Sequence, residues 1–222
     1  MDIANLIQTV AIYALPVLLA ITLYGVARSE AARYFGDTTA EEMGRITLNP
    51  LQHIDPIGTF VVPLLLYLAS AGTLLFGYAK ASPVDFSRLR NPKRDLIWVS
   101  LAGPMSNFAQ AFLWAFGLLT MKALGIEEVF FLKMAQAGIM VNLAMWAFNL
   151  FPLPPLDGGR ILIGLLPLRQ AQWLSRVEPW GFFVVLGLAV IGVVGAVWLR
   201  PLMAAGYAVI SLLLTPLMFL LR

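Results

Sequence analysis

Two residues of the first apolar segment and one distant carboxylate are the groups whose types and spacing could do chemistry. Tyr24 and Arg28 stand four residues apart, so on a helix they share one face. Asp157 follows the proline-rich stretch Pro152-Leu153-Pro154-Pro155, which forces the backbone out of helix. Irregular backbone at membrane depth must line protein or a wet cavity. An ionisable residue there is a functional candidate, although Asp157 could instead cap a helix that starts near Arg160.

The spacing of Tyr24 and Arg28 is that of a metal-binding motif, but their types are not. In H-E-x-x-H, two histidines on one helical face bind zinc, and the glutamate between them acts on the metal-bound water. Here Tyr24 and Arg28 hold the ligand positions, and Gly25 holds the position of the base. A guanidinium stays protonated and offers a cation no lone pair. We therefore predict no zinc and no other cofactor.

The composition places these residues in a membrane protein. Of 222 residues, 60% are hydrophobic and only 12% are charged, about half the share of a soluble domain. The net charge of +3 needs no nucleic-acid partner, because Lys and Arg in cytoplasmic loops explain it. Disulfides and thiolate metal sites are excluded, since the chain has no cysteine. The first apolar run is too long for a signal peptide and is expected to be a retained span.

Six apolar segments are long enough to cross a bilayer, which takes about 20 residues per helix. They cover residues 6–27, 57–78, 96–121, 129–151, 182–199 and 202–221. We expect an all-α polytopic membrane protein of about six transmembrane helices, with a short β-strand or loop insertion between the first two. Residues 1–222 show no internal repeat and no long linker. They are expected to form one membrane domain, with a C-terminal helix pair at about 180–222.

The basic residues give an expected orientation. Residues 80–94 form the densest basic loop, and Arg160, Arg169 and Arg176 follow the fourth span. Because cytoplasmic loops are enriched in Lys and Arg, both segments are expected in the cytoplasm. With six spans, both termini would then be cytoplasmic too. Basic residues in the first loop count against this orientation.

A polar stretch at residues 29–56 joins the first two spans. Gly36-Asp37 predicts a turn, and Thr38 to Glu42 predicts a helical turn with a capping-box pattern. The alternation in Arg45-Ile46-Thr47-Leu48 predicts a short strand, which Asn49-Pro50 would end. A structured connector with no further role would show the same turn chemistry.

Two other polar residues have ordinary structural explanations. His53 is the only histidine, and such a residue near Asp55 is more often a hydrogen-bonded loop residue than a ligand. Gly103-Pro104, inside the third span, should loosen or kink the helix and free a backbone carbonyl. Asn107 beside it could be interhelical glue.

Taken together, four ordered motifs resemble the site-2 protease family of intramembrane zinc metalloproteases, in its short bacterial branch. The resemblance covers about residues 15–165 and implies an integral protein of the bacterial inner membrane. The motifs are Gly36-Asp37-x-Thr39-Ala40, Gly44 to Pro50 with His53 to Thr59, Ala102-Gly103-Pro104 with Asn107, and Asn149 to Gly158.

The resemblance implies roles for particular residues. The family's two zinc-binding histidines fall on Tyr24 and Arg28, its catalytic glutamate falls on Gly25, and its aspartate ligand falls on Asp157. Two of three ligands and the base are therefore replaced, so whether the chain is an enzyme stays open. In the family the zinc-bound water, activated by the glutamate, attacks a peptide bond.

Other positions of the family pattern are retained. An oxyanion-side asparagine falls on Asn149, and a supporting polar position falls on Asn107. The edge strand, where an extended substrate segment adds by β-augmentation, falls on Arg45, Ile46, Thr47, Leu48 and Asn49. The replaced ligands and the retained positions together favour a non-catalytic relative. Such a protein would lie in the lipid bilayer and bind a membrane-protein segment or partner without cleaving it.

Loss of the metal also predicts a new contact. Without zinc, Asp157 is a carboxylate in a poorly solvated pocket, where an unpaired charge is costly. Arg28 supplies a permanent charge with planar donors that suit a carboxylate, and Tyr24 lies one helical turn earlier on the same face. We expect Arg28 to pair with Asp157, unless its side chain extends to the lipid headgroups instead.

Three alternatives remain open. The chain could be an active zinc metalloprotease with rearranged ligands, such as Asp157, His53 and Glu30. It could be a transporter or channel on the same scaffold, although it has no inverted repeat and no paired broken helices. It could also be a metal-independent enzyme with Tyr24 and Asp157 as acid and base, although the spacing suggests no nucleophile.

Overall fold

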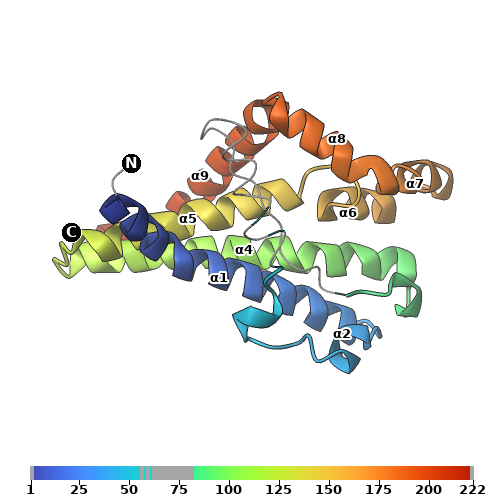
Figure 1. The fold of residues 1–222 in the computed structure, drawn as a ribbon, viewed down its shortest axis with the longest axis horizontal. Coiled ribbons are helices and arrows are strands. Elements are labelled where there is room, and N and C mark those ends of the chain that lie inside the picture. Colours follow the sequence, from blue (N-terminus) through green and yellow to red (C-terminus); the bar gives the residue numbers. More distant parts are fainter. Residues whose placement is uncertain (1–2, 56–57, 59–60, 62–82, 221–222) are drawn as a thin grey trace.

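The computed structural model describes residues 3–55, 58, 61, 83–220, and these are largely helical. Three long helices form its centre: α1 (Ile3–Tyr34), α4 (Pro92–Ala123) and α5 (Val129–Asn149). They pack side by side, with α1 and α5 running in one direction and α4 in the other (Figure 1). The all-helical class expected from the sequence is confirmed for the described residues.

Small residues let these helices approach closely, as is typical of helix packing in membranes. A Cβ atom on Gly138 of α5 would lie 2.3 Å from the ring of Trp114 on α4. The buried core between α4, α5 and the C-terminal helix is formed by alanines and aliphatic residues. Its members are Ala111, Ala115, Ile139, Leu143, Ile210 and Leu214.

Pro104 does not interrupt α4, which continues from Pro92 to Ala123. The Ser106 hydroxyl donates a hydrogen bond to the Gly103 carbonyl at 2.8 Å, so one polar group near the proline has a local partner. Pro92 itself stands in the first turn of α4, where its missing N–H costs nothing.

The C-terminal part consists of short helices followed by one long one. These are α6 (Asp157–Leu165), α7 (Leu168–Ser175), α8 (Glu178–Val190), the π-helical η4 (Val194–Leu199) and α9 (Arg200–Leu220). The expected boundary between the last two spans, near Arg200-Pro201, is wrong. The break falls at Gly192 instead, whose φ of 79° is the left-handed conformation that ends helices. Pro201 lies in the first turn of α9, where proline is tolerated.

The expected count of six spans is not confirmed by the described residues. Among the described residues, three helices are long and apolar enough to cross a membrane: Ile7–Tyr34, Val129–Asn149 and Val194–Leu217. The bent pair Leu168–Ser175 and Glu178–Val190 would make a fourth. The expected span at 57–78 lies outside the described residues, apart from positions 58 and 61. The expected span at 96–121 lies within α4, which is not among these three helices. Buried polar residues such as Asn107 and Gln110 lower the mean hydropathy of α4.

The polar stretch after α1 folds into short turns rather than a strand. It contains α2 (Thr39–Glu42) and η1 (Pro50–Gln52), so the expected helical turn is present. The Thr38 hydroxyl donates to the carboxylate of Glu42 at 2.6 Å and does not cap the helix backbone. This bond and the Arg88 guanidinium hold the pKa of Glu42 below its usual range.

The strand expected at residues 45–48 is not confirmed, because that backbone is irregular. The Arg45 guanidinium donates to the Gln52 carbonyl at 2.5 Å, and the His53 imidazole Nε2 lies 2.8 Å from the Thr47 carbonyl oxygen. These contacts close the segment on itself as a loop. A strand needs a neighbouring strand for its backbone hydrogen bonds, and the described part of the chain offers none.

Contacts fix which segments share an end of the bundle. The buried carboxylate of Asp37 accepts a hydrogen bond from the Asp85 N–H at 2.8 Å, and Arg88 pairs with Glu42 at 3.2 Å. The stretch after α1 therefore lies beside η3 (Phe86–Arg88) and the start of α4. The first residues of α1 and the last of α9 lie at the opposite end (Figure 1).

This arrangement bears on the expected orientation. Cytoplasmic placement of both basic segments was expected to bring the termini to the same side. In the structure, the basic start of α4 lies at the end of the bundle opposite the start of α1. The argument from the loop charges therefore no longer places the termini in the cytoplasm.

Candidate functional site

Tyr24, Arg28 and Asp157 meet where α1 passes the start of α6. The Tyr24 hydroxyl donates a hydrogen bond to Oδ2 of Asp157, and Arg28 Nη1 lies 3.4 Å from Oδ1 of the same carboxylate. Only 1% of the surface of Asp157 is exposed, and only 8% of that of Arg28. Helical spacing on α1 thus presents two side chains to one buried carboxylate.

The loop before α6 holds Asp157 in place through its own backbone. The Leu153 N–H donates to the Phe151 carbonyl at 2.8 Å, and the Leu156 N–H donates to the Leu153 carbonyl at 3.1 Å. α6 then begins at Asp157 itself, so the alternative in which Asp157 caps a helix that starts near Arg160 does not hold. A carboxylate in the first turn also interacts favourably with the helix dipole.

Glycines allow the close packing that this loop requires. A Cβ atom on Gly158 would lie 2.1 Å from the Leu150 carbonyl oxygen, and one on Gly159 would lie 2.0 Å from the Pro154 nitrogen. From the other side, a Cβ atom on Gly181 of α8 would lie 1.6 Å from the Pro154 carbonyl oxygen. The Asp157 loop is therefore held between α5, α6 and α8.

Tyr24 has room for its ring because α4 carries a glycine opposite it. A Cβ atom on Gly103 would lie 2.4 Å from the tyrosine ring. The ring of Tyr24 thus packs directly on Gly103 of α4. Gly103 therefore serves helix packing, a role additional to the kink and the family motif that the sequence suggested.

Similarity to known proteins assigns this chain to a family. Residues 125–192 match peptidase family M50. A Bacillus subtilis (strain 168) protein named "Putative zinc metalloprotease YwhC" is 38% identical over 194 residues, which cover 85% of this chain and 84% of that protein. The chain belongs to the site-2 protease family.

More distant members agree with this assignment. Two proteins named "Putative zinc metalloprotease Rip2", from Mycolicibacterium smegmatis and Mycobacterium tuberculosis, are 30% and 31% identical over 173 and 176 residues. Each alignment covers 78% of this chain and 64% of the relative. No solved structure matches this site-2 family member.

The residues around Asp157 do not fit the zinc ion that these names imply. A catalytic zinc site takes three protein ligands and keeps a fourth position open. Among the described residues, no three His, Cys, Asp or Glu side chains come close enough to hold a metal. The guanidinium of Arg28 lies 3.4 Å from the Asp157 carboxylate, and its permanent positive charge repels a metal cation at that position.

The rearranged ligand set is not assembled either. His53 directs Nε2 to the Thr47 carbonyl, and Glu30 pairs with Arg33 at 2.7 Å on the exposed side of α1. Both proposed replacement ligands therefore have other partners. An active enzyme built on Asp157, His53 and Glu30 has no support in this geometry.

The side-chain amides of the two expected asparagines donate to groups other than the Asp157 carboxylate. Asn107 donates to the Ala20 carbonyl at 3.2 Å and to Oδ1 of Asn142 at 2.9 Å, so it links α4 to α1 and α5. Asn149 donates to the Met145 carbonyl of its own helix at 2.9 Å. Asn142 was missed by sequence reasoning, although a buried amide within an apolar span is a recognisable signal.

Polar groups of the site retain unused hydrogen-bonding capacity. In the described part of the chain, neither Oδ1 of Asp157 nor Nε of Arg28 has a hydrogen-bond partner, although both are buried. The contact between Arg28 and Asp157 is thus a charge pair at 3.4 Å, longer than a bidentate hydrogen-bonded pair. The low dielectric around the pair strengthens the Coulomb attraction between the two charges.

Proposed function

We propose that this member of the site-2 protease family binds a membrane-protein segment or partner and does not cleave it. The observation that carries the proposal is the convergence of Tyr24 and Arg28 on Asp157. These two residues stand at two ligand positions of the family, and both contact the carboxylate at the third position. The protein would act as a single membrane domain in the bacterial inner membrane. The excess of Lys and Arg around α4 and α7 favours the cytoplasm for that end.

Zinc analysis tests the loss of catalysis. We expect purified wild-type protein to hold no stoichiometric zinc, since one carboxylate does not make a three-ligand site. The variant Tyr24→His/Gly25→Glu/Arg28→His should bind about one zinc per chain, and adding Asp157→Ala should abolish this binding. Elemental analysis of these three proteins and of the single variant Asp157→Ala, prepared in parallel, provides the measurement. About one zinc per wild-type chain, lost with Asp157→Ala, would overturn the proposal.

The retained binding function is proposed for Arg45, Ile46, Thr47, Leu48 and Asn49. The loop is fixed by the contacts of Arg45 and His53, yet 68% of Leu48 and 74% of Leu51 is exposed. A fixed loop with protruding apolar side chains offers a partner a preformed surface. The backbone between its internal contacts could still pair with an extended segment.

Site-specific crosslinking tests this surface. Photo-crosslinkers at Ile46 and Leu48 should capture a discrete membrane protein in cells, and the same group at the exposed Leu124, at the far end of α4, should not. Capture of lipid alone, or of the same species from position 124, in variants that purify as folded protein would count against a retained partner surface.

A further inference from the structure

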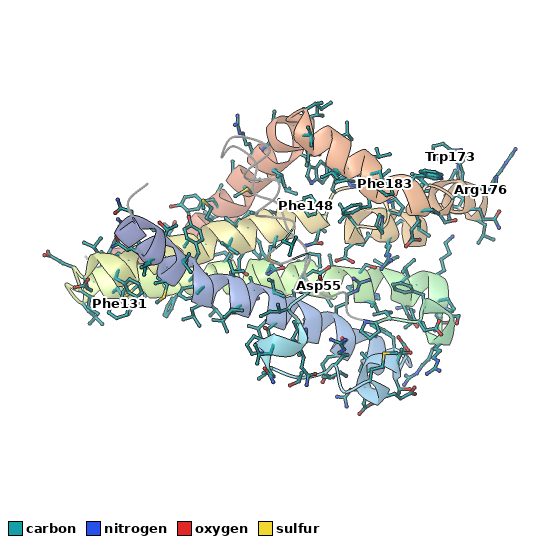
Figure 2. The ribbon with its side chains drawn as sticks, viewed as in Figure 1. Asp55, Phe131, Phe148, Trp173, Arg176 and Phe183 are labelled. Carbon is teal, nitrogen blue, oxygen red and sulfur yellow. The ribbon has the colours of Figure 1, made fainter. Side chains whose placement is uncertain are left out.

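An aromatic residue stands between two cations on one face of α7 and its C-cap residue, Arg176. Arg169, Trp173 and Arg176 are spaced i, i+4 and i+7, so they form one stripe. All three are exposed, with 69% of the Trp173 surface accessible. The opposite face of α7 is buried through Ala171 and Leu174. Figure 2 shows Trp173 and Arg176 projecting from α7 at one end of the molecule.

Other unpaired cations lie at the start of α4, on which α6 packs. A Cβ atom on Gly164 of α6 would lie 2.4 Å from Cγ1 of Ile97 and 2.9 Å from the Lys93 carbonyl oxygen, so the end of α6, which leads into α7, packs on the first turns of α4. Those turns expose Lys93 and Arg94. None of the α4 and α7 cations forms an ion pair among the described residues.

Exposed apolar side chains occur in α7 and in the neighbouring ends of α6 and α8. Leu165 is 64% exposed, Leu168 is 69% exposed and Trp180 is 69% exposed. Such side chains gain by contact with hydrocarbon, and tryptophan is enriched where hydrocarbon meets headgroups. An eight-residue helix is about 12 Å long and cannot span a bilayer. α7 also bends 66° from α8, as a helix lying in the interface would.

We propose that the α7 stripe of Arg169, Trp173 and Arg176 binds the headgroups of anionic phospholipids, with Lys93 and Arg94 adding to its positive field. The arginines contact lipid phosphates, and Trp173 lies at the boundary with the acyl chains. An acidic protein could also meet the cations, but the exposed leucines and tryptophans beside them favour lipid. This inference does not depend on whether the chain cleaves peptides.

Lipid retention tests the stripe in the intact protein. Wild-type protein is reconstituted into nanodiscs of equal phosphatidylglycerol and phosphatidylcholine, and the lipids that stay bound on release are counted by native mass spectrometry. Wild type should retain more phosphatidylglycerol than the nanodisc ratio. Each cation near the surface contributes to the attraction of anionic lipid, so Arg169→Gln/Arg176→Gln should lose most of the enrichment, and its ratio of retained phosphatidylglycerol to phosphatidylcholine should fall toward that of the nanodisc.

Two further variants make the result specific. Arg169→Lys/Arg176→Lys keeps the charge and should keep the enrichment. Lys122→Gln/Lys133→Gln removes the same charge from exposed positions at the other end of the bundle and should also keep it. The proposal is overturned if wild type shows no enrichment, if the glutamine stripe variant matches wild type, or if the Lys122/Lys133 variant falls equally.

Discussion

Arg28→Met and Asp157→Asn should each destabilise the detergent-purified protein strongly, and the double variant should recover much of the loss. Each single change leaves a buried polar or charged group without its partner, which costs about 3–5 kcal/mol for a buried ion pair. The double change removes both charges from the same pocket, where both side chains are almost fully buried. Thermal unfolding of the four proteins in one detergent measures the coupling.

An exposed ion pair on the same helix provides the control. Arg33 pairs with Glu30 at 2.7 Å, but their side chains are 46% and 41% exposed. Arg33→Met should therefore change the unfolding free energy by less than about 1 kcal/mol. If the stability losses of Arg28→Met and Asp157→Asn add up in the double variant, the two side chains do not interact in the detergent-purified protein.

The class of fold followed from simple physical properties of the sequence. A hydrophobic content of 60% with so few charges demands lipid as the solvent, and backbone groups in lipid must be satisfied within helices. The shared face of Tyr24 and Arg28 followed from the helical repeat alone. Asp157 is far away in the sequence, and only the ordered family motifs suggested that it would face them.

Other features depend on contacts that no local pattern reveals. The end of the bundle at which each loop lies is decided by pairs such as Asp37 with Asp85 and Glu42 with Arg88, which are distant in sequence. The hydropathy pattern predicts where spans lie but carries no information about these contacts between distant residues. The expected orientation of the termini therefore rested on an incomplete argument. The expected strand at residues 45–48 failed for a related reason, because alternation does not supply a neighbouring strand.

The same limit applies to the C-terminal helices, whose boundaries depend on packing. The sequence showed Gly181 as one of several glycines in an apolar run. The structure shows that it packs directly on the loop that carries Asp157, beside the Arg160–Glu178 ion pair at 2.8 Å. α8 thus supports the candidate site from beyond the sequence motifs, the last of which ends at Gly158, although it lies within the match to peptidase family M50 at residues 125–192.

Gly181→Ala should disrupt this support, whereas Gly187→Ala in the same helix should not. A methyl group on Gly181 would lie 1.6 Å from the Pro154 carbonyl oxygen, a backbone atom that cannot move aside as a flexible side chain can. Overpacking of this kind costs about 1–3 kcal/mol or more. Gly187 has no atom within 4 Å of the same position, so its replacement should be neutral or stabilise α8 by up to about 1 kcal/mol. Thermal unfolding of the two variants compares them directly, and equal melting temperatures would mean that α8 does not press on the Asp157 loop.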